Sequence, residues 1–262
     1  GGAAGLATTL ARRRPLGSAF ARRPALWALG IGGLFGYHAL YFAALRLAPP
    51  AEASLVAFLW PLLLVLLSGL LPGERLRAIH IVGAVTAFSG VLVLAAGRDL
   101  GARMEDLPGY LLAFAAALVW AGYSVLSRRT AGVPTDAVTG FCLASAALSL
   151  LCHLGFEETV WPAGAAEWLA VIALGVGPVG AAFYAWDVGC KRGDIRILGV
   201  SAYAAPVIST VALVLAGRAE PTAALFVACA LIVSGALVAS ADRLAPRARS
   251  RSVTPPVPPA SA

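Results

Sequence analysis

Long apolar runs separated by short clusters of charge are the feature that most limits how this chain can fold. The runs are about 20 residues long, the length at which an α-helix covers roughly 30 Å of hydrocarbon. Only 13% of the 262 residues are charged and 60% are hydrophobic, whereas soluble domains carry about 25% charged residues. The sequence therefore disfavours a soluble fold and predicts an all-α, polytopic membrane protein.

The borders of these runs predict eight complete transmembrane spans. Two of the starts carry a proline and an acid, Pro50 with Glu52 and Pro221 with Glu220. These residues indicate a helix start, because a first helical turn tolerates the missing N–H of proline and favours negative charge. The expected spans are residues 25–47, 50–71, 78–97, 108–127, 136–156, 165–189, 196–217 and 221–241.

The basic residues alternate between the two ends of these spans. Sixteen of the 20 Lys and Arg residues fall in one set of loops, and most loop acids fall in the other set. Because basic loops are retained in the cytoplasm, we expect the first set and the C-terminus to be cytoplasmic, in a bacterial inner membrane. This topology accounts for the net charge of +7 without nucleic-acid binding.

An internal repeat organises the chain. A shift of 145 residues aligns the sequence with itself without a gap. A unit of five spans, an odd number, places its second copy upside down, which is a common plan of secondary transporters. We therefore predict two inverted five-helix repeats, at 1–97 and 108–241, joined by a periplasmic linker at 98–107. The matched pairs include Gly30 and Gly175, Gly32 and Gly177, Pro61 and Pro206, and Gly90 and Gly235.

The two ends of the chain lie outside the complete spans. Residues 1–11 are apolar but too short to cross a membrane, and Arg12, Arg13 and Arg14 follow them, the reverse of a secretory signal. We expect them to be the tail of a helix that begins upstream, so that the first repeat is truncated and the full plan has ten helices. Residues 242–262 are rich in Arg, Ser and Pro and are expected to be a disordered tail.

Two prolines near the middle of their spans mark the predicted substrate cavity. Pro61 and Pro206 each remove one backbone hydrogen bond and crowd the carbonyl four residues earlier. Paired helix breaks indicate a midplane binding site, and packing kinks are the alternative. Near mid-depth, aromatic residues with polar tips need a partner or a cavity, unlike the usual interfacial Trp and Tyr. These residues are Tyr37, Tyr41, Trp60 and Tyr203, beside His38.

Two ionisable residues inside the spans are candidates for proton coupling. Asp187 stands four residues before Lys191 near a predicted cytoplasmic end, so an i,i+4 ion pair is the favoured interpretation. His38 has no such neighbour, and it could relay a proton, bind a substrate carboxylate or be a satisfied buried histidine. Phosphate loops, metal-spaced His and Cys clusters and nucleophile elbows are absent from the sequence, so we expect no enzyme, catalytic residue, metal or cofactor.

Several motifs resemble the EamA-type branch of the drug/metabolite transporter superfamily. They are Tyr37-His38-Ala39-Leu40-Tyr41, Pro50-Ala51-Glu52-Ala53, Phe58-Leu59-Trp60-Pro61-Leu62 and Tyr203-Ala204-Ala205-Pro206. The stretch from Phe183 to Asp187 is most similar to aromatic amino acid exporters. The resemblance implies ten helices around a central cavity, and export of amino acids. Carried over by position, the cavity residues are Tyr37, His38, Tyr41, Trp60, Trp120, Tyr184, Trp186 and Tyr203.

The functional hypothesis is export of small metabolites, above all aromatic or other amino acids, by alternating access. Its expected partners are the substrate and the lipid bilayer, with no nucleic acid and no obligate protein partner. A carrier of nucleotide-sugars or lipid-linked sugars is one alternative, although such a carrier favours basic residues in its cavity and the predicted spans have none near mid-depth. A truncated, non-transporting membrane protein is the other.

Overall fold

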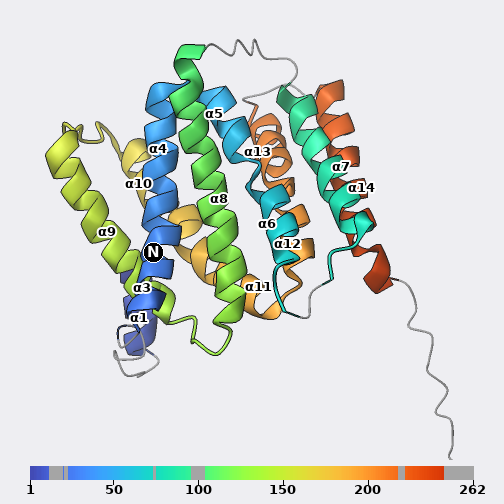
Figure 1. Ribbon diagram of the computed structural model, residues 1–262. Coiled ribbons are helices and arrows are strands. Elements are labelled where there is room, and N and C mark those ends of the chain that lie inside the picture. The colour runs from blue at the N-terminus through green and yellow to red at the C-terminus, as the bar shows by residue number, and fades with distance from the viewer. Residues whose placement is uncertain (12–19, 21–22, 73–74, 96–103, 218–221, 245–262) are drawn as a thin grey trace, which may run out of the picture.

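The computed structural model describes residues 1–262 except 12–19, 21–22, 73–74, 96–103, 218–221 and 245–262. Every regular element in the described part is helical, and the helices stand side by side in one bundle (Figure 1). Four of them are long and apolar enough to cross a membrane: Pro24–Leu47, Met104–Arg129, Ala137–Phe156 and Ala165–Arg192. Four shorter apolar helices accompany them: Glu52–Ser68, Ala78–Val93, Ile195–Ser209 and Ala223–Ala239. The predicted all-α, polytopic membrane class is confirmed.

The elements of the first half are α1 (Gly2–Ala11), α3 (Pro24–Ile31), η1 (Gly32–Gly36), α4 (Tyr37–Leu47), α5 (Pro50–Ala57), α6 (Trp60–Ser68) and α7 (Ala78–Ala95). Those of the second half are η2 (Met104–Asp106), α8 (Leu107–Arg129), α9 (Ala137–Phe156), α10 (Ala165–Val176), η3 (Gly177–Ala181), α11 (Ala182–Arg192), α12 (Ile195–Ser201), α13 (Ala204–Leu215) and α14 (Ala223–Leu244). Most of the predicted linker at 98–107 and of the predicted tail at 242–262 lies outside the described residues.

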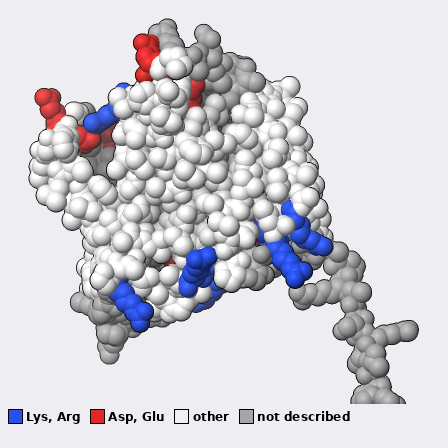
Figure 2. Space-filling view, in the orientation of Figure 1, with Lys and Arg blue, Asp and Glu red and all other residues white. Residues whose placement is uncertain are grey.

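On the face drawn in Figure 2, the charged side chains of the described residues lie at the two ends of the bundle. Most of the Lys and Arg side chains in view lie along one end, most of the acidic side chains lie at the other end beside a basic one, and a broad uncharged band separates the two ends. The band carries exposed apolar side chains such as Leu111, Leu150 and Leu174. An exposed apolar surface of this extent indicates a membrane environment.

Two spans change from α- to π-helix at matching positions. The π-segment η1 separates α3 from α4, and η3 separates α10 from α11 exactly one repeat length, 145 residues, later. Both segments are rich in small residues, GGLFG and GPVGA. A π-segment inserts one residue into the helix and is found frequently at functional sites. Here each one directly precedes a helix that begins with aromatic residues, Tyr37 after η1 and Phe183 after η3.

Two further spans are broken before their prolines. Phe58 and Leu59 interrupt the span between α5 and α6, and Ala202 and Tyr203 interrupt the span between α12 and α13. Pro61 and Pro206 have no N–H to donate to the carbonyl four residues earlier, and their rings crowd that carbonyl. Both predicted breaks are present.

Among the described elements, α7 and α14 make the most extensive contact, and they lie side by side (Figure 1). A Cβ atom on Gly83 would lie 2.6 Å from the carbonyl oxygen of Gly235, and one on Gly90 would lie 2.9 Å from that of Ala228. The backbones therefore touch, in antiparallel order, through the small residues that membrane helices use for close packing.

Candidate substrate cavity

An aromatic cluster forms around Trp120 of α8. Tyr37 of α4 lies with its ring centroid 5.3 Å away, Phe183 of α11 5.9 Å, Trp186 of α11 6.0 Å and Trp60 of α6 6.3 Å. Trp60 and Trp186 also meet edge-on at 5.2 Å. Offset and edge-to-face pairs at such distances are favourable, at about 0.5–1.5 kcal/mol each beyond area burial. Residues from both halves of the chain thus converge on one ring.

Two polar tips in and beside the cluster, those of Trp186 and Tyr41, are bonded within the bundle. The indole N–H of Trp186 donates to Ser124 Oγ at 2.9 Å, and Ser124 Oγ donates to the carbonyl of Trp120 at 2.8 Å. The hydroxyls of Tyr41 and Ser54 are 2.9 Å apart, and the rings of Tyr37 and Tyr41 stack one helical turn apart, 5.9 Å between centroids. The hydrogen bonds fix the ring orientations and leave the π-faces for apolar contact.

His38 stands at the edge of the cluster. Its Nδ1 is 2.6 Å from the carbonyl oxygen of Leu34. A carbonyl only accepts, so Nδ1 carries a proton and Nε2 is the nitrogen left for a ligand. The ring meets Phe183 edge-on at 5.9 Å, which places one titratable side chain next to the aromatic cluster.

Two neighbouring hollows, both with His38 in their walls, form the candidate cavity. One has a volume of about 270 Å³, and its wall includes His38, Ser145 and Phe183 together with Gly1 and Gly2 at the start of the first helix. The other has about 340 Å³ and extends to the outer ends of α4 and α9. They share Phe35, His38, Phe42 and Ser149, and Figure 2 shows the surface hollowed beside the charges at the upper left. Small-molecule pockets typically measure about 300–1,000 Å³, so the joined hollows suit a metabolite.

Sequence reasoning missed part of this wall. Phe35 and Phe42 lie on the same helix face as His38, at spacings of three and four residues, and that spacing was the available signal. Ser145 has a buried hydroxyl oxygen for which the described part of the chain provides no hydrogen-bond partner. Buried polar groups are usually satisfied, so this hydroxyl is suited to a ligand in the cavity.

The structure gathers some predicted residues and separates others. Tyr37, His38, Tyr41, Trp60, Trp120 and Trp186 come together around the cluster. Tyr184 lies elsewhere: its hydroxyl is 3.0 Å from Thr139 Oγ1, and it lines a separate hollow of about 530 Å³ near Asp136 and Arg192.

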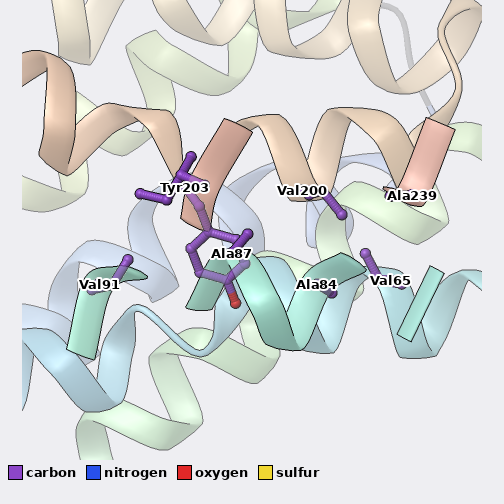
Figure 3. Packing of buried hydrophobic residues seen from close by; sticks show 8 residues of the cluster. Val65, Ala84, Ala87, Val91, Val200, Tyr203 and Ala239 are labelled. Atoms are coloured by element: carbon purple, nitrogen blue, oxygen red, sulfur yellow. The ribbon is translucent and has the colours of Figure 1, made fainter. Parts of the chain in front are cut away.

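Tyr203 and the prolines lie in helix interfaces. Tyr203 is fully buried, and Figure 3 shows its ring directed past Ala87 of α7 within a core that also contains Val65 and Val200. Pro61 is fully buried too, and its carbonyl oxygen would lie 3.2 Å from a Cβ on Gly199 of α12. Pro206 stands in the first turn of α13, which packs on α14. Tyr203, Pro61 and Pro206 therefore determine how the helices bend and pack, and their side chains are not part of the aromatic cluster around Trp120.

Asp187 is held by its neighbours at the basic end of the bundle. Lys191 Nζ lies 2.8 Å from its carboxylate, and Thr135 Oγ1 donates to it at 2.7 Å. Both charged side chains are nearly buried, at 4% and 7% exposure. Lys191 also donates to the carbonyl of Val133 at 2.9 Å, which ties α11 to the loop before α9. The expected i,i+4 ion pair is present.

Other basic side chains at this end donate to carbonyls of neighbouring helices. Arg128 of α8 bonds the carbonyls of Cys190 and Gly193 at the end of α11. Arg129 bonds the carbonyl of Leu70 after α6 at 3.0 Å. Cations favour helix C-termini because exposed carbonyls concentrate negative potential there. The Arg129 contact joins the two halves of the chain at the basic end, whereas the Arg128 contacts tie α8 to α11 within the second half.

The opposite end has a different, exposed link between the halves. Arg46 Nη2, in the last turn of α4, lies 2.6 Å from Glu157 Oε1, just beyond α9. His153 Nδ1 lies 2.9 Å from Glu157 Oε2. The hydrogen bond from His153 and the nearby Arg46 guanidinium hold the pKa of the Glu157 carboxyl below its ordinary value.

Comparison with known proteins agrees with this architecture. The EamA-like transporter family matches residues 2–96 and 107–241. The chain belongs to this family. The aromatic amino acid exporter YddG of Ancylobacter novellus is 60% identical to this EamA-like protein over 243 residues, 92% of this chain and 84% of that one. YddG of Salmonella typhimurium is 28% identical over 170 residues, 61% of this chain and 56% of the relative.

A solved crystal structure has the same fold. It is 60% identical, superposes with a TM-score of 0.86, and covers 92% of this chain and 84% of the other. This EamA-like protein is therefore a multi-pass membrane transporter and not an enzyme.

Proposed function

We propose that this transporter exports aromatic and other bulky amino acids by alternating access. The observation that carries the proposal is the Trp120 cluster, to which both halves contribute and whose Phe183 also lines the cavity beside His38. Two relatives named as aromatic amino acid exporters support the substrate class. The proposed substrate-site residues are Tyr37, His38, Tyr41, Trp60, Trp120 and Trp186; Tyr184, Tyr203, Pro61 and Pro206 lie away from this cluster.

The cavity chemistry matches an amino acid with an apolar side chain. Phe183 and Phe42 offer rings for stacking, and Ser145 offers a hydroxyl that has no hydrogen-bond partner among the described residues. Neutral His38 presents Nε2 as an acceptor for the substrate ammonium, and protonation converts the same atom into a donor for the carboxylate. This exchange makes His38 our first candidate for proton coupling. Asp187 is the second candidate for proton coupling, and its ion pair with Lys191 would first have to break.

The proposed architecture is two inverted five-helix repeats with eight complete spans, the first repeat at 1–97 and the second at 108–241. The small-residue contact of α7 and α14 supports it. A shift of 145 residues relates Gly83 to Ala228 and Gly90 to Gly235, and the contacts join Gly83 to Gly235 and Gly90 to Ala228. Such reciprocal pairing is what a two-fold axis between equivalent helices produces.

The proposed state has its cytoplasmic end closed. Basic residues mark that end, which makes the C-terminus cytoplasmic in an inner-membrane protein. The contact of Arg129 with the carbonyl of Leu70 joins the two halves at that end, and the cavity beside His38 extends toward the opposite end. We propose that the loss of the cytoplasmic contacts accompanies opening toward the cytoplasm.

Efflux from proteoliposomes tests the function. Vesicles carrying the purified protein are loaded with labelled phenylalanine, tryptophan, methionine or threonine. We expect saturable efflux of the aromatic amino acids, with KM raised about 2- to 10-fold by Trp60→Ala and by Tyr37→Ala, because each removes one stacking partner. Trp161→Ala is the matched control, since Trp161 is 73% exposed and stands outside the cluster. No flux of any amino acid, or unchanged KM in both variants, contradicts the proposal.

A further inference from the structure

The start of α12 is fastened to the segment that joins α6 to α7. Arg196 Nη1 donates to the backbone carbonyl oxygen of Arg75 at 3.0 Å. Arg75 belongs to the first half of the chain and Arg196 to the second, so this bond crosses between the halves at the basic end, as the bond from Arg129 to the carbonyl of Leu70 does. Two arginines of the second half therefore hold backbone carbonyls of one first-half segment.

Asp194 determines where the Arg196 side chain points. Arg196 Nε donates to Asp194 Oδ1 at 3.2 Å, and Nη2 donates to Oδ2 at 3.1 Å. Such a two-point contact fixes the plane of the guanidinium group, and the remaining nitrogen, Nη1, then reaches Arg75. The side chains of Arg196 and Asp194 are 11% and 6% exposed, so water and salt screen the pair only weakly.

The same carboxylate begins the helix. Asp194 is the N-cap residue of α12, and its Oδ1 accepts from the backbone N–H of Arg196 at 3.0 Å and from that of Ile197 at 3.5 Å. An acidic N-cap satisfies backbone donors that the first turn of a helix leaves unpaired. One side chain thus fixes both the first turn of α12 and the guanidinium group that crosses to the first half.

A close apolar contact lies beside this bond. Ile195, next to Arg196, is fully buried, and a Cβ atom on Gly199, one turn later, would lie 3.2 Å from the carbonyl oxygen of Pro61 in α6. Helix α12 therefore lies against α6 (Figure 1). The bond from Arg196 to Arg75 stands at the edge of this packed interface between the two halves. The apolar core at this end comprises Leu64, Leu71, Ala121, Val125 and Ile195.

The internal repeat puts no equivalent of this pair at the opposite end. The shift of 145 residues relates Asp194 to Pro49 and Arg196 to Ala51, at the start of α5. The side chains of proline and alanine carry neither a donor nor a charge, so neither position can hold a guanidinium group against a carbonyl. The basic end therefore has a fastening that the other end lacks at its matched position.

We propose that Asp194 and Arg196 form a latch that keeps the cytoplasmic end closed and favours the outward-open state, with Asp194 as the positioning residue for Arg196. The inference rests on the proposed function and adds to it a cause for the preference between its two states. Opening toward the cytoplasm separates α12 from the segment between α6 and α7 and breaks the bond to Arg75.

Loss of the latch changes the two apparent affinities in opposite directions. A substrate on the cytoplasmic side binds only inward-open molecules, and a substrate outside binds only outward-open ones, so each KM rises as the share of its state falls. A hydrogen bond to a charged group contributes about tenfold to an equilibrium constant. For an outward-open preference of about ten to one, its loss makes the two states about equal. The cytoplasmic KM then falls about fivefold and the external KM rises about twofold.

Exchange in membrane vesicles of both orientations tests the latch. Inside-out and right-side-out vesicles from cells that produce the protein are loaded with unlabelled tryptophan, and the KM for uptake of labelled tryptophan is measured; vesicles from cells without the protein give the background. The variants are Arg196→Gln, which removes the guanidinium group, and Asp194→Asn, which keeps an N-cap oxygen but removes the charge that positions Arg196. Arg75→Gln is the matched control, because the latch uses the backbone carbonyl of Arg75 and leaves its side chain exposed.

The proposal predicts a crossed change. Arg196→Gln and Asp194→Asn each lower the cytoplasmic KM about fivefold and raise the external KM about twofold, while Arg75→Gln leaves both at the values of the unmodified protein. General damage to the fold would instead reduce the maximal rate or change both KM values in the same direction. If Arg196→Gln yields no folded protein, Asp194→Asn decides, since it preserves the helix cap.

Other results separate the two hypotheses. Unchanged KM values in the latch variants, a change in the same direction on both sides, or the same crossed change in Arg75→Gln overturns the latch and leaves the proposed function standing. An absence of tryptophan exchange above background in the unmodified protein overturns the proposed function itself.

Discussion

Replacing Gly33 by alanine should disturb the aromatic cluster around Trp120, although the added methyl group meets Tyr123 and not Trp120. Gly33 is buried in η1, and a Cβ atom there would lie 2.3 Å from the ring carbons Cγ and Cδ2 of Tyr123. The Tyr123 ring packs 5.4 Å from that of Trp120. Gly33→Ala therefore pushes α8 away from η1 or turns Tyr123 toward the cluster.

The adjacent Gly32 provides a matched control. A Cβ atom on Gly32 meets nothing within 4 Å, although both glycines belong to the same π-segment. Replacing glycine by alanine in a helix gains up to about 1 kcal/mol of intrinsic propensity, and overpacking a core costs about 1–3 kcal/mol. The propensity gain is common to both variants, so the difference between them isolates the overpacking term.

Thermal unfolding in detergent measures this difference. For a chain of this size, 1 kcal/mol shifts the midpoint by about 2–4 °C. We expect Gly33→Ala to unfold at least about 2–4 °C below Gly32→Ala and to transport more slowly. Equal midpoints and equal transport would refute the close contact between η1 and α8.

Three more perturbations follow from individual contacts. Ser124→Ala removes the acceptor of the partly buried indole N–H of Trp186 and should lower the free energy of unfolding by about 1 kcal/mol, as measured by denaturation; an unchanged midpoint contradicts it. Lys191→Met leaves the carboxylate of Asp187 unpaired and should cost about 3–5 kcal/mol, part of which the double variant Lys191→Met, Asp187→Leu recovers; no recovery contradicts the ion-pair account. Because folding lowers the pKa of Glu157, its ionised carboxylate contributes to the free energy of unfolding at pH values above the ordinary pKa of about 4.3. This contribution is lost only as the pH falls through the lower pKa of the folded state. NMR titration of labelled glutamate should show that pKa rise toward the ordinary value in Arg46→Gln.

Hydropathy predicts the membrane class because apolar length is a local property of the sequence. The break before Pro61 is equally local, since a missing N–H and a crowded carbonyl act within one helical turn. The π-segments were missed. The Gly-x-Gly pattern at Gly30 and Gly32 served to align the repeat with Gly175 and Gly177. A Cβ atom on Gly30 would lie 2.3 Å from Cγ of Phe141, whereas one on Gly32 would meet nothing within 4 Å. The shared signal of the two π-segments was a glycine-rich segment just before Tyr37 and Phe183.

The site was harder to predict because an apolar membrane helix gives little indication of which face is interior. Tyr37, Trp60 and Trp120 meet as expected, whereas Tyr203 points into the core beside α7. Tyr203 lies in the helix break between α12 and α13, and its side chain is directed away from the cluster. The hydrophobic periodicity of the sequence does not predict the direction of a side chain at such a break. Phe42 carries no polar tip, so its place in the cavity wall had no signal beyond its spacing from His38.

The KM for efflux in a Phe183→Leu variant tests the central claim most directly. Phe183 joins the cluster to the cavity, through its contacts with Trp120 and His38 and its place in the cavity wall. If its ring stacks on the substrate, its loss raises the KM for tryptophan by about 2- to 10-fold and changes that for methionine less than twofold. Equal changes for tryptophan and methionine, or no change for either, would contradict an aromatic substrate site at this cluster.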